Sequence, residues 1–376
     1  MSKIQQPIPS DDSFAYLLLT LLAICGEVPA ALVSQLPGSE SYQAKAITRL
    51  KSGHWITTYY SDGLRGFRLT KAAKRELVQL QPERFVTILS GSNSATSPKY
   101  SLPSRLRLHR MAEALVMMYR TGVVVLPWEK PGAFLPDDRF TPFTLTRPTY
   151  YSSLEVKRIG EQGNIIRNSR ATGVLLAPDR IFAVFNTADG EMKWEYEAEL
   201  RLKILLQQDI CYTRLPDQYA SIIPGAIVVS PDMNQFPPLL RGKAAGKKPF
   251  VLGNQFDHFH YLTTDHHGEV LLQILCSPKQ RDQLDRTLLC DLSPAKAFLT
   301  ENDGFDEKGN PVLLAYSCDI PRIYRFYSGL LAHGLRGTAF CFDFQEAALR
   351  EVCGNTVGFE VIDFDIYERS VFHNTL

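Results

Sequence analysis

Residues 55–70 read WITTYYSDGLRGFRLT, and the chain continues with KAAKRELVQL. WITTYY and GFRLT have the β-branched and aromatic composition of strands, and Asp62-Gly63 between them is a strong turn signal. We therefore expect a β-hairpin followed by a helix. Arg65 and Arg68 then lie near the tip and in the second strand of the hairpin.

Helical patterns precede this hairpin. The first covers roughly residues 14–25, with Asp11, Asp12 or Ser13 as its N-cap. The second is PAALVSQLP, in which Pro29 suits a first helical turn.

A third helix is expected in SYQAKAITRLKSG, ending at Gly53. Its apolar residues Ala44, Ile47 and Leu50 follow helical spacing and predict the buried face.

Helices, a hairpin and a further helix follow in the order of a winged helix-turn-helix. AITRLKSGHWI…GFRLTKAAKREL resembles the end of the recognition helix, the wing and the helix after it in that family. The resemblance covers residues 14–81. In the family the third helix enters the major groove and the wing contacts the DNA backbone or the minor groove. It implies groove contacts by Tyr42, Gln43, Lys45, Thr48 and Arg49, and phosphate contacts by Arg65 and Arg68.

Charge is distributed unevenly along the 376 residues. Thirteen Lys or Arg residues and three acidic residues lie between Lys45 and Arg110, although the whole chain carries a net charge of only +1. Such a basic region is a hint of contact with nucleic acid, because Lys and Arg displace counterions from phosphates. A solvated charged surface is the alternative that composition alone leaves open.

Composition shifts divide the chain. We expect an α/β protein in which residues 10–88 form the winged helix, an α+β domain, and the Ser- and Pro-rich residues 89–104 form a linker. A nuclease-like α/β domain is expected at 105–241. A C-terminal α/β domain with a mostly parallel sheet is expected at 249–376, because apolar runs such as EVLLQILC (269–276) alternate with helical patterns.

The middle domain resembles restriction-endonuclease-like nucleases. Strands are expected at 171–179, 180–187 and 192–197 (MKWEYE), followed by a helix at 198–208 and a strand at 225–230. Such enzymes gather carboxylates around Mg²⁺ and use a lysine to steady the attacking water. Mg²⁺ is therefore the cofactor expected if this domain cleaves DNA, and no cofactor is expected otherwise. Candidate catalytic residues are Glu155, Asp179, Glu195, Glu197 and Lys203.

The family pattern breaks at Glu195-Tyr196-Glu197, where an acidic residue, any residue and a lysine are expected. An inactive nuclease-like fold and purely structural carboxylates therefore remain alternatives.

Together with the wing, LLAPDRIFAVFNTADGEMKWEYEAELRLK resembles the replication-relaxation proteins of plasmids and conjugative elements. This resemblance implies an accessory or regulatory role in plasmid replication or DNA mobilisation. A homodimer, a relaxase or a replication protein is the further partner it suggests. A protein-interaction scaffold without DNA is the remaining alternative.

FDHFHYLTTDHH (256–267) is a candidate metal site. His258 and His260 are two residues apart on an expected strand and so point the same way, and Asp257, Asp265 or His266 could complete the site. Ordinary polar strand ends are the alternative.

The seven cysteines include no CxxC pair, and several lie in apolar runs, which favours buried reduced thiols. AYLLLTLLAIC (15–25) is too short to span a bilayer, so we expect a cytoplasmic protein with no membrane contact.

Overall fold

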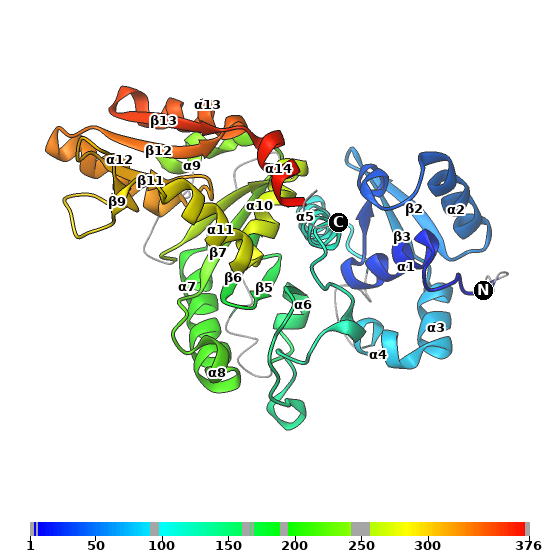
Figure 1. The fold of residues 1–376 in the computed structure, drawn as a ribbon. Helices are drawn as coiled ribbons and strands as arrows, with labels where there is room; N and C mark the ends of the chain where they lie inside the picture. Colours follow the sequence, from blue (N-terminus) through cyan, green and yellow to red (C-terminus); the bar gives the residue numbers. More distant parts are fainter. Residues whose placement is uncertain are drawn as a thin grey trace. The chain divides into compact units, whose positions relative to one another are not determined.

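A computed structural model describes residue 4 and residues 7–90, 98–159, 166, 169–188, 195–241 and 256–372. Its helices and mixed sheets belong to the α/β class. The chain forms two compact units, coloured by sequence in Figure 1. Unit 1 comprises Met1–Pro131 and Thr149–Val156, and unit 2 comprises Gly132–Pro148 and Lys157–Leu376.

Unit 1 is mostly helical around a small sheet. Its helices are α1 (Phe14–Cys25), η1 (Ala31–Gln35), α2 (Glu40–Ser52), α3 (Lys71–Leu80), α4 (Pro82–Leu89), α5 (Leu102–Arg120), η2 (Pro127–Glu129) and α6 (Ser153–Val156). Its strands are β1 (Val28–Pro29), β2 (Ile56–Ser61), β3 (Leu64–Leu69) and β4 (Thr149–Ser152).

The hairpin predicted from Asp62-Gly63 is present. Strands β2 and β3 pair antiparallel from Ile56 opposite Leu69 to Ser61 opposite Leu64. Asp62 and Gly63 have φ values of 53° and 76°, the positive values that a tight hairpin turn needs. β1 joins the other edge of β3, so the sheet order is β1-β3-β2.

The segment after α1 differs from its prediction. Pro29 lies in β1, opposite Gly66 of β3, and a short 3₁₀ helix, η1, follows in place of the second predicted helix. Pairing with β3 holds this proline in an extended conformation. The first predicted helix is confirmed, and Ser13 caps it by accepting a hydrogen bond from the Tyr16 N–H.

Helix α5 belongs to unit 1, whereas the sequence predicts most of it to be part of the middle domain. It packs against α1 and β1. Its buried face includes Ala112, Leu115 and Val116. The polar residues Arg105 and His109 are buried as well.

Unit 2 contains mixed sheets flanked by helices (Figure 1). In the first, β5 runs antiparallel to β6, while β6, β7 and β8 are parallel. In the second, β13, β12 and β11 are parallel, and β10 and β9 continue the sheet antiparallel. The strands are β5 (Gly173–Ala177), β6 (Arg180–Asn186), β7 (Gly225–Ser230), β8 (Phe259–Thr263), β9 (Ser293–Pro294), β10 (Gly304–Phe305), β11 (Pro311–Leu314), β12 (Gly337–Phe342) and β13 (Val357–Ile362).

Unit 2 also contains helices, several of which connect its parallel strands. They are η3 (Asp137–Arg139), α7 (Tyr196–Leu205), the π-helical η5 (Leu206–Arg214), α8 (Pro216–Tyr219), η6 (Met233–Gln235), α9 (Phe236–Arg241), α10 (His266–Cys276), α11 (Pro278–Leu289), α12 (Ile320–His333), α13 (Asp343–Cys353), η7 (Gly354–Thr356) and α14 (Phe364–Phe372). Strands β5, β7 and β8 are buried along their whole length, as expected for strands covered on both faces.

Several predictions for unit 2 need correction. Of MKWEYE, residues 192–194 lie outside the described residues, and helix α7 begins at Tyr196, so the end of this segment is not a strand. EVLLQILC belongs to α10, because the Asp265 side chain caps a helix by accepting from the Gly268 N–H. The predicted boundary between the middle and C-terminal domains, at 241–249, separates β7 from β8. These two strands pair in one sheet, so no domain boundary lies there.

All seven cysteines are free thiols, and all but Cys290 are buried. The prediction of buried, reduced thiols is thus confirmed except at Cys290, which is exposed. Among the described residues, no helix is both long enough and apolar enough to cross a bilayer.

The start of α10 provides a test of unit 2. A Cβ atom added at Gly268 would lie 1.8 Å from the Thr263 carbonyl oxygen. We predict that Gly268→Ala lowers the free energy of unfolding by at least about 2 kcal/mol, because backbone must move to relieve this overlap. Gly358→Ala is the control, since its nearest neighbours would lie at 3.8 Å. Urea unfolding measures both, and equal midpoints for the two variants would contradict the packing described for α10.

Candidate nucleic-acid interface

Helix α2 exposes a polar face. Its N-cap, Ser39, accepts a hydrogen bond from the Tyr42 N–H at 3.4 Å, and Gly53 ends the helix. Leu50 lies on the buried side of α2. Four of the residues predicted to contact a DNA groove are exposed: Tyr42, Lys45, Thr48 and Arg49. Their spacing of three and four residues places them along one side of the helix.

Gln43, predicted to face a groove, is buried instead and only 3% exposed. Its amide nitrogen donates to the carbonyl oxygens of Leu36 and Gly38, at 2.7 and 3.2 Å. Ala44, predicted to be buried, is exposed. The buried face of α2 therefore includes Leu50 as predicted, but Gln43 takes the place of Ala44, because its side chain bonds to the backbone of the preceding loop.

The two arginines of the hairpin lie in different environments. Arg65 is exposed and stands opposite Tyr60, itself exposed, in the strand register. Arg68 is buried, so its predicted phosphate contact is wrong. Residues three apart in a strand point to opposite faces of the sheet, which explains why only one of the two reaches solvent.

Arg68 belongs to a buried cluster around Glu27, whose carboxylate is inaccessible to solvent. The Arg68 guanidinium donates to Glu27 Oε2 at 2.6 and 2.9 Å. From α5, Arg105 Nη2 donates to Oε1 at 2.6 Å, and His109 Nε2 lies 2.9 Å from the same oxygen. The Tyr59 ring covers both guanidinium groups, with centroid distances of 3.9 and 4.7 Å. We call these five residues the Glu27 cluster.

The Glu27 cluster fixes the hairpin to α5. Arg105 also donates to the carbonyl oxygens of Ser61 and Leu64, which flank the hairpin turn, at 2.7 and 3.1 Å. A Cβ at position 66 would lie 2.4 Å from Glu27 Oε1, so a larger residue there would push the Glu27 side chain out of this position. One buried carboxylate thereby sets the position of the strand that carries Arg65.

Opposing effects act on the pKa of Glu27. Burial by itself raises the pKa of a carboxyl group, but hydrogen bonds from His109, Arg105 and Arg68 outweigh it and lower the pKa to about 2. Glu27 is therefore ionised at neutral pH and balances the buried arginines.

The candidate nuclease residues are paired separately. Glu155 belongs to unit 1 and accepts from Lys130 at 2.8 Å. In unit 2, Asp179 pairs with Arg281, Glu195 with Arg170 at 3.2 Å, Glu197 with Arg201 at 3.5 Å, and Lys203 with Asp257 at 2.9 Å. Each of these four residues of unit 2 has a different partner, so the contacts described there give no support to a metal-dependent nuclease.

His258 and His260 stand side by side with nearly parallel rings, whose centroids are 6.4 Å apart. Each has its own partner: His258 Nδ1 lies 2.6 Å from the buried Asp319, and His260 Nδ1 lies 3.0 Å from the Ser317 carbonyl oxygen. Burial lowers the pKa of His260 to about 4, so this ring is neutral at pH 7.

The ligands proposed to complete the histidine site are engaged elsewhere. Asp257 pairs with Lys203, Asp265 caps α10, and His266 Nε2 lies 2.6 Å from Glu368. In the part of the chain that the structure describes, no group of three His, Cys, Asp or Glu side chains could hold a metal ion. The histidine metal site is therefore not supported.

Comparison with family models, with characterised proteins and with solved structures finds no match. The candidate site therefore rests on the geometry of this chain alone. It consists of the exposed face of α2 together with Arg65.

The Glu27 cluster was not anticipated from the sequence. One signal is an acidic residue between the apolar segments LLAIC and VPAALV, where a charge requires a buried partner. Arg105 and His109 are four residues apart and so lie on the same side of a helix, which is a weak second signal.

Removing the central charge tests the cluster. We predict that Glu27→Gln lowers the free energy of unfolding of unit 1 by about 3–5 kcal/mol, because two arginines remain buried without a counter-charge. Glu83→Gln, at an exposed glutamate of the same unit, should change it by no more than about 0.5 kcal/mol. Urea unfolding measures the free energy of unfolding of both variants. If Glu27→Gln lowers it as little as Glu83→Gln does, the role given to Glu27 is contradicted.

The stability of unit 1 should also depend on pH. Because the pKa of folded Glu27 is about 2, below its ordinary value, its stabilisation is present above the ordinary value and is lost as the pH falls toward 2. The stability advantage of the wild type over Glu27→Gln should therefore shrink between about pH 5 and pH 2. An advantage that stays constant over this range would contradict the lowered pKa.

Proposed function

We propose that unit 1 binds duplex DNA, with α2 as the recognition helix and the β2–β3 hairpin as the wing. The observation that carries this proposal is the exposed row of Tyr42, Lys45, Thr48 and Arg49 on α2. α2 packs against β2, and the same hairpin exposes Arg65. A helix in the major groove needs protruding polar and cationic side chains and a second element that grips the backbone.

The order of elements supports the same proposal. The helices α1, η1 and α2 precede a hairpin whose second strand pairs with β1, as in a winged helix-turn-helix. The side chains suit separate tasks: Lys45, Arg49 and Arg65 attract phosphates or guanine, while Thr48 and Tyr42 offer hydroxyl groups and apolar contact to base edges.

We further propose that the chain acts as a DNA-binding accessory or regulatory protein of a plasmid or conjugative element. The resemblance of the sequence to replication-relaxation proteins supports this role. Unit 2 enters the proposal without a reaction, because its candidate carboxylates are held by separate cations.

Salt-dependent binding tests the DNA interface. We predict that Arg49→Ala/Arg65→Ala weakens duplex binding at least about tenfold near physiological salt, because phosphate contacts and their counterion release are lost. If both arginines contact phosphates, the slope of log affinity against log salt concentration should decrease by about 2 in magnitude. Fluorescence anisotropy with labelled duplexes of mixed sequence measures both quantities.

The matched control removes the same charge from unit 2. Arg286→Ala/Arg336→Ala replaces two exposed arginines there and should retain both the affinity and the salt slope. If the two double variants bind alike, or if the wild type shows no salt-sensitive affinity, the proposed interface is wrong.

A further inference from the structure

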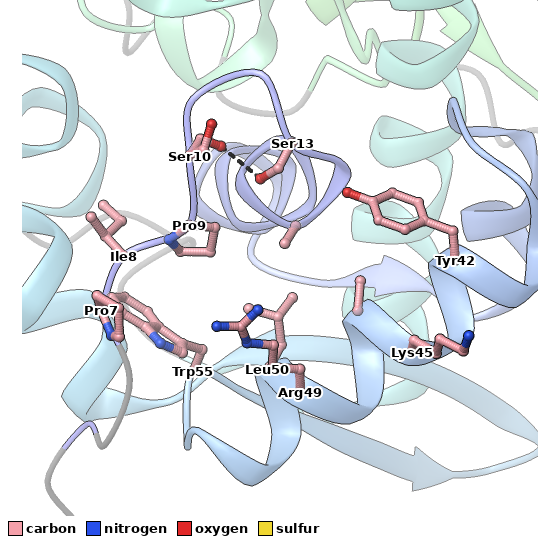
Figure 2. A pocket seen from close by; sticks show the side chains of 12 residues that line it. Pro7, Ile8, Pro9, Ser10, Ser13, Tyr42, Lys45, Arg49, Leu50 and Trp55 are labelled. Atoms are coloured by element: carbon pink, nitrogen blue, oxygen red, sulfur yellow. Dashed lines mark hydrogen bonds between the residues drawn. The ribbon is translucent and has the colours of Figure 1, made fainter.

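A pocket opens beside the exposed face of α2. It has a volume of about 490 Å³ and lies between α2 and the segment that leads into α1 (Figure 2). This volume is within the range of pockets that hold small organic ligands. Its position matters because Tyr42, Lys45 and Arg49 of the candidate DNA interface also line it.

The lining is mainly apolar, with one cation directed inward. Ile8, Pro9 and Leu50 provide aliphatic walls. Figure 2 shows the Arg49 guanidinium turned toward the middle of the pocket, whereas Lys45 points away from it. An apolar enclosure with a single guanidinium fits an apolar body that carries one anionic group, because the planar guanidinium pairs with both oxygens of such a group.

Trp55 adds an aromatic wall to the pocket, although only 1% of the residue is exposed. Its indole Nε1 has no hydrogen-bond partner among the described residues and is inaccessible to solvent, so it does not reach the open space of the pocket. The ring therefore offers apolar contact to the body of a ligand.

We propose that the pocket binds an amphipathic organic anion, consisting of an aromatic or aliphatic body with one carboxylate or sulfonate group, and that this ligand competes with DNA. The anion pairs with Arg49, and the body fills the space between Ile8 and Leu50. Because Arg49 cannot pair with a phosphate at the same time, occupancy of the pocket weakens DNA binding. The competition rests on the proposed function, whereas binding of the anion does not.

The probe for this test is 8-anilinonaphthalene-1-sulfonate, an aromatic sulfonate that fluoresces when it enters an apolar site. Titration of the full chain should give a saturable signal with a micromolar dissociation constant. Arg49→Gln should weaken binding at least about tenfold, because the anion loses its counter-charge. Ala46→Phe, at a residue that lines the pocket, should abolish it by filling the cavity.

Two matched variants serve as controls. Ala44→Phe places the same bulk at an exposed position of α2 outside the lining, and Arg65→Gln removes an exposed arginine of the hairpin. Both should bind the probe like the wild type, and circular dichroism establishes that each variant is folded. The pocket proposal is overturned if the wild type does not bind the probe. It is also overturned if Ala46→Phe and Arg49→Gln both bind the probe as tightly as the wild type does.

Competition is measured separately. Saturating probe should weaken the binding of a labelled duplex at least about fivefold in the wild type and leave Ala46→Phe unaffected. Unchanged DNA affinity at saturating probe overturns the competition. A wild type that binds the probe in the pocket but no DNA would refute the proposed function while leaving the ligand site standing.

Discussion

A single buried carboxylate organises the candidate interface. Glu27 has no contact with solvent, and a charge in that position is tolerated only because Arg68, Arg105 and His109 surround it. These partners come from β3 and α5, so the cluster joins the hairpin to the long helix of unit 1. The Glu27 side chain also lies against Gly66 of β3, where a larger residue would displace it. The exposed Arg65 owes its position to this buried charge.

The basic character of the first hundred residues therefore has two origins. Arg68 and Arg105 contribute to the count of positive charges, but they neutralise Glu27 and offer nothing to a phosphate. Lys45, Arg49 and Arg65 are exposed and form the part of the charge that a polyanion can reach. The pocket beside α2 draws on Arg49 as well, which gives the interface a physical means of responding to a small anion.

Local signals in the sequence were sufficient where one residue type determines the backbone. Asp62-Gly63 predicted the hairpin turn, Ser13 the start of α1, and the continuous apolar runs the buried strands of unit 2. Prediction failed where a polar side chain bonds to nearby backbone, which hydrophobic spacing does not reveal: Gln43 is held by the preceding loop, and Asp265 caps the apolar run of α10. The nuclease and metal sites required carboxylates and histidines to converge, and convergence depends on the tertiary fold.

The most direct test of the account is site-directed cleavage of bound DNA. An iron–EDTA group attached at Thr48→Cys, in a Cys290→Ser background that removes the exposed native thiol, should cut a bound duplex at one localised position. The same group at Thr87→Cys, an exposed site on α4, should leave the duplex intact. Cleavage from position 87 with none from position 48 would contradict the claim that α2 faces the DNA.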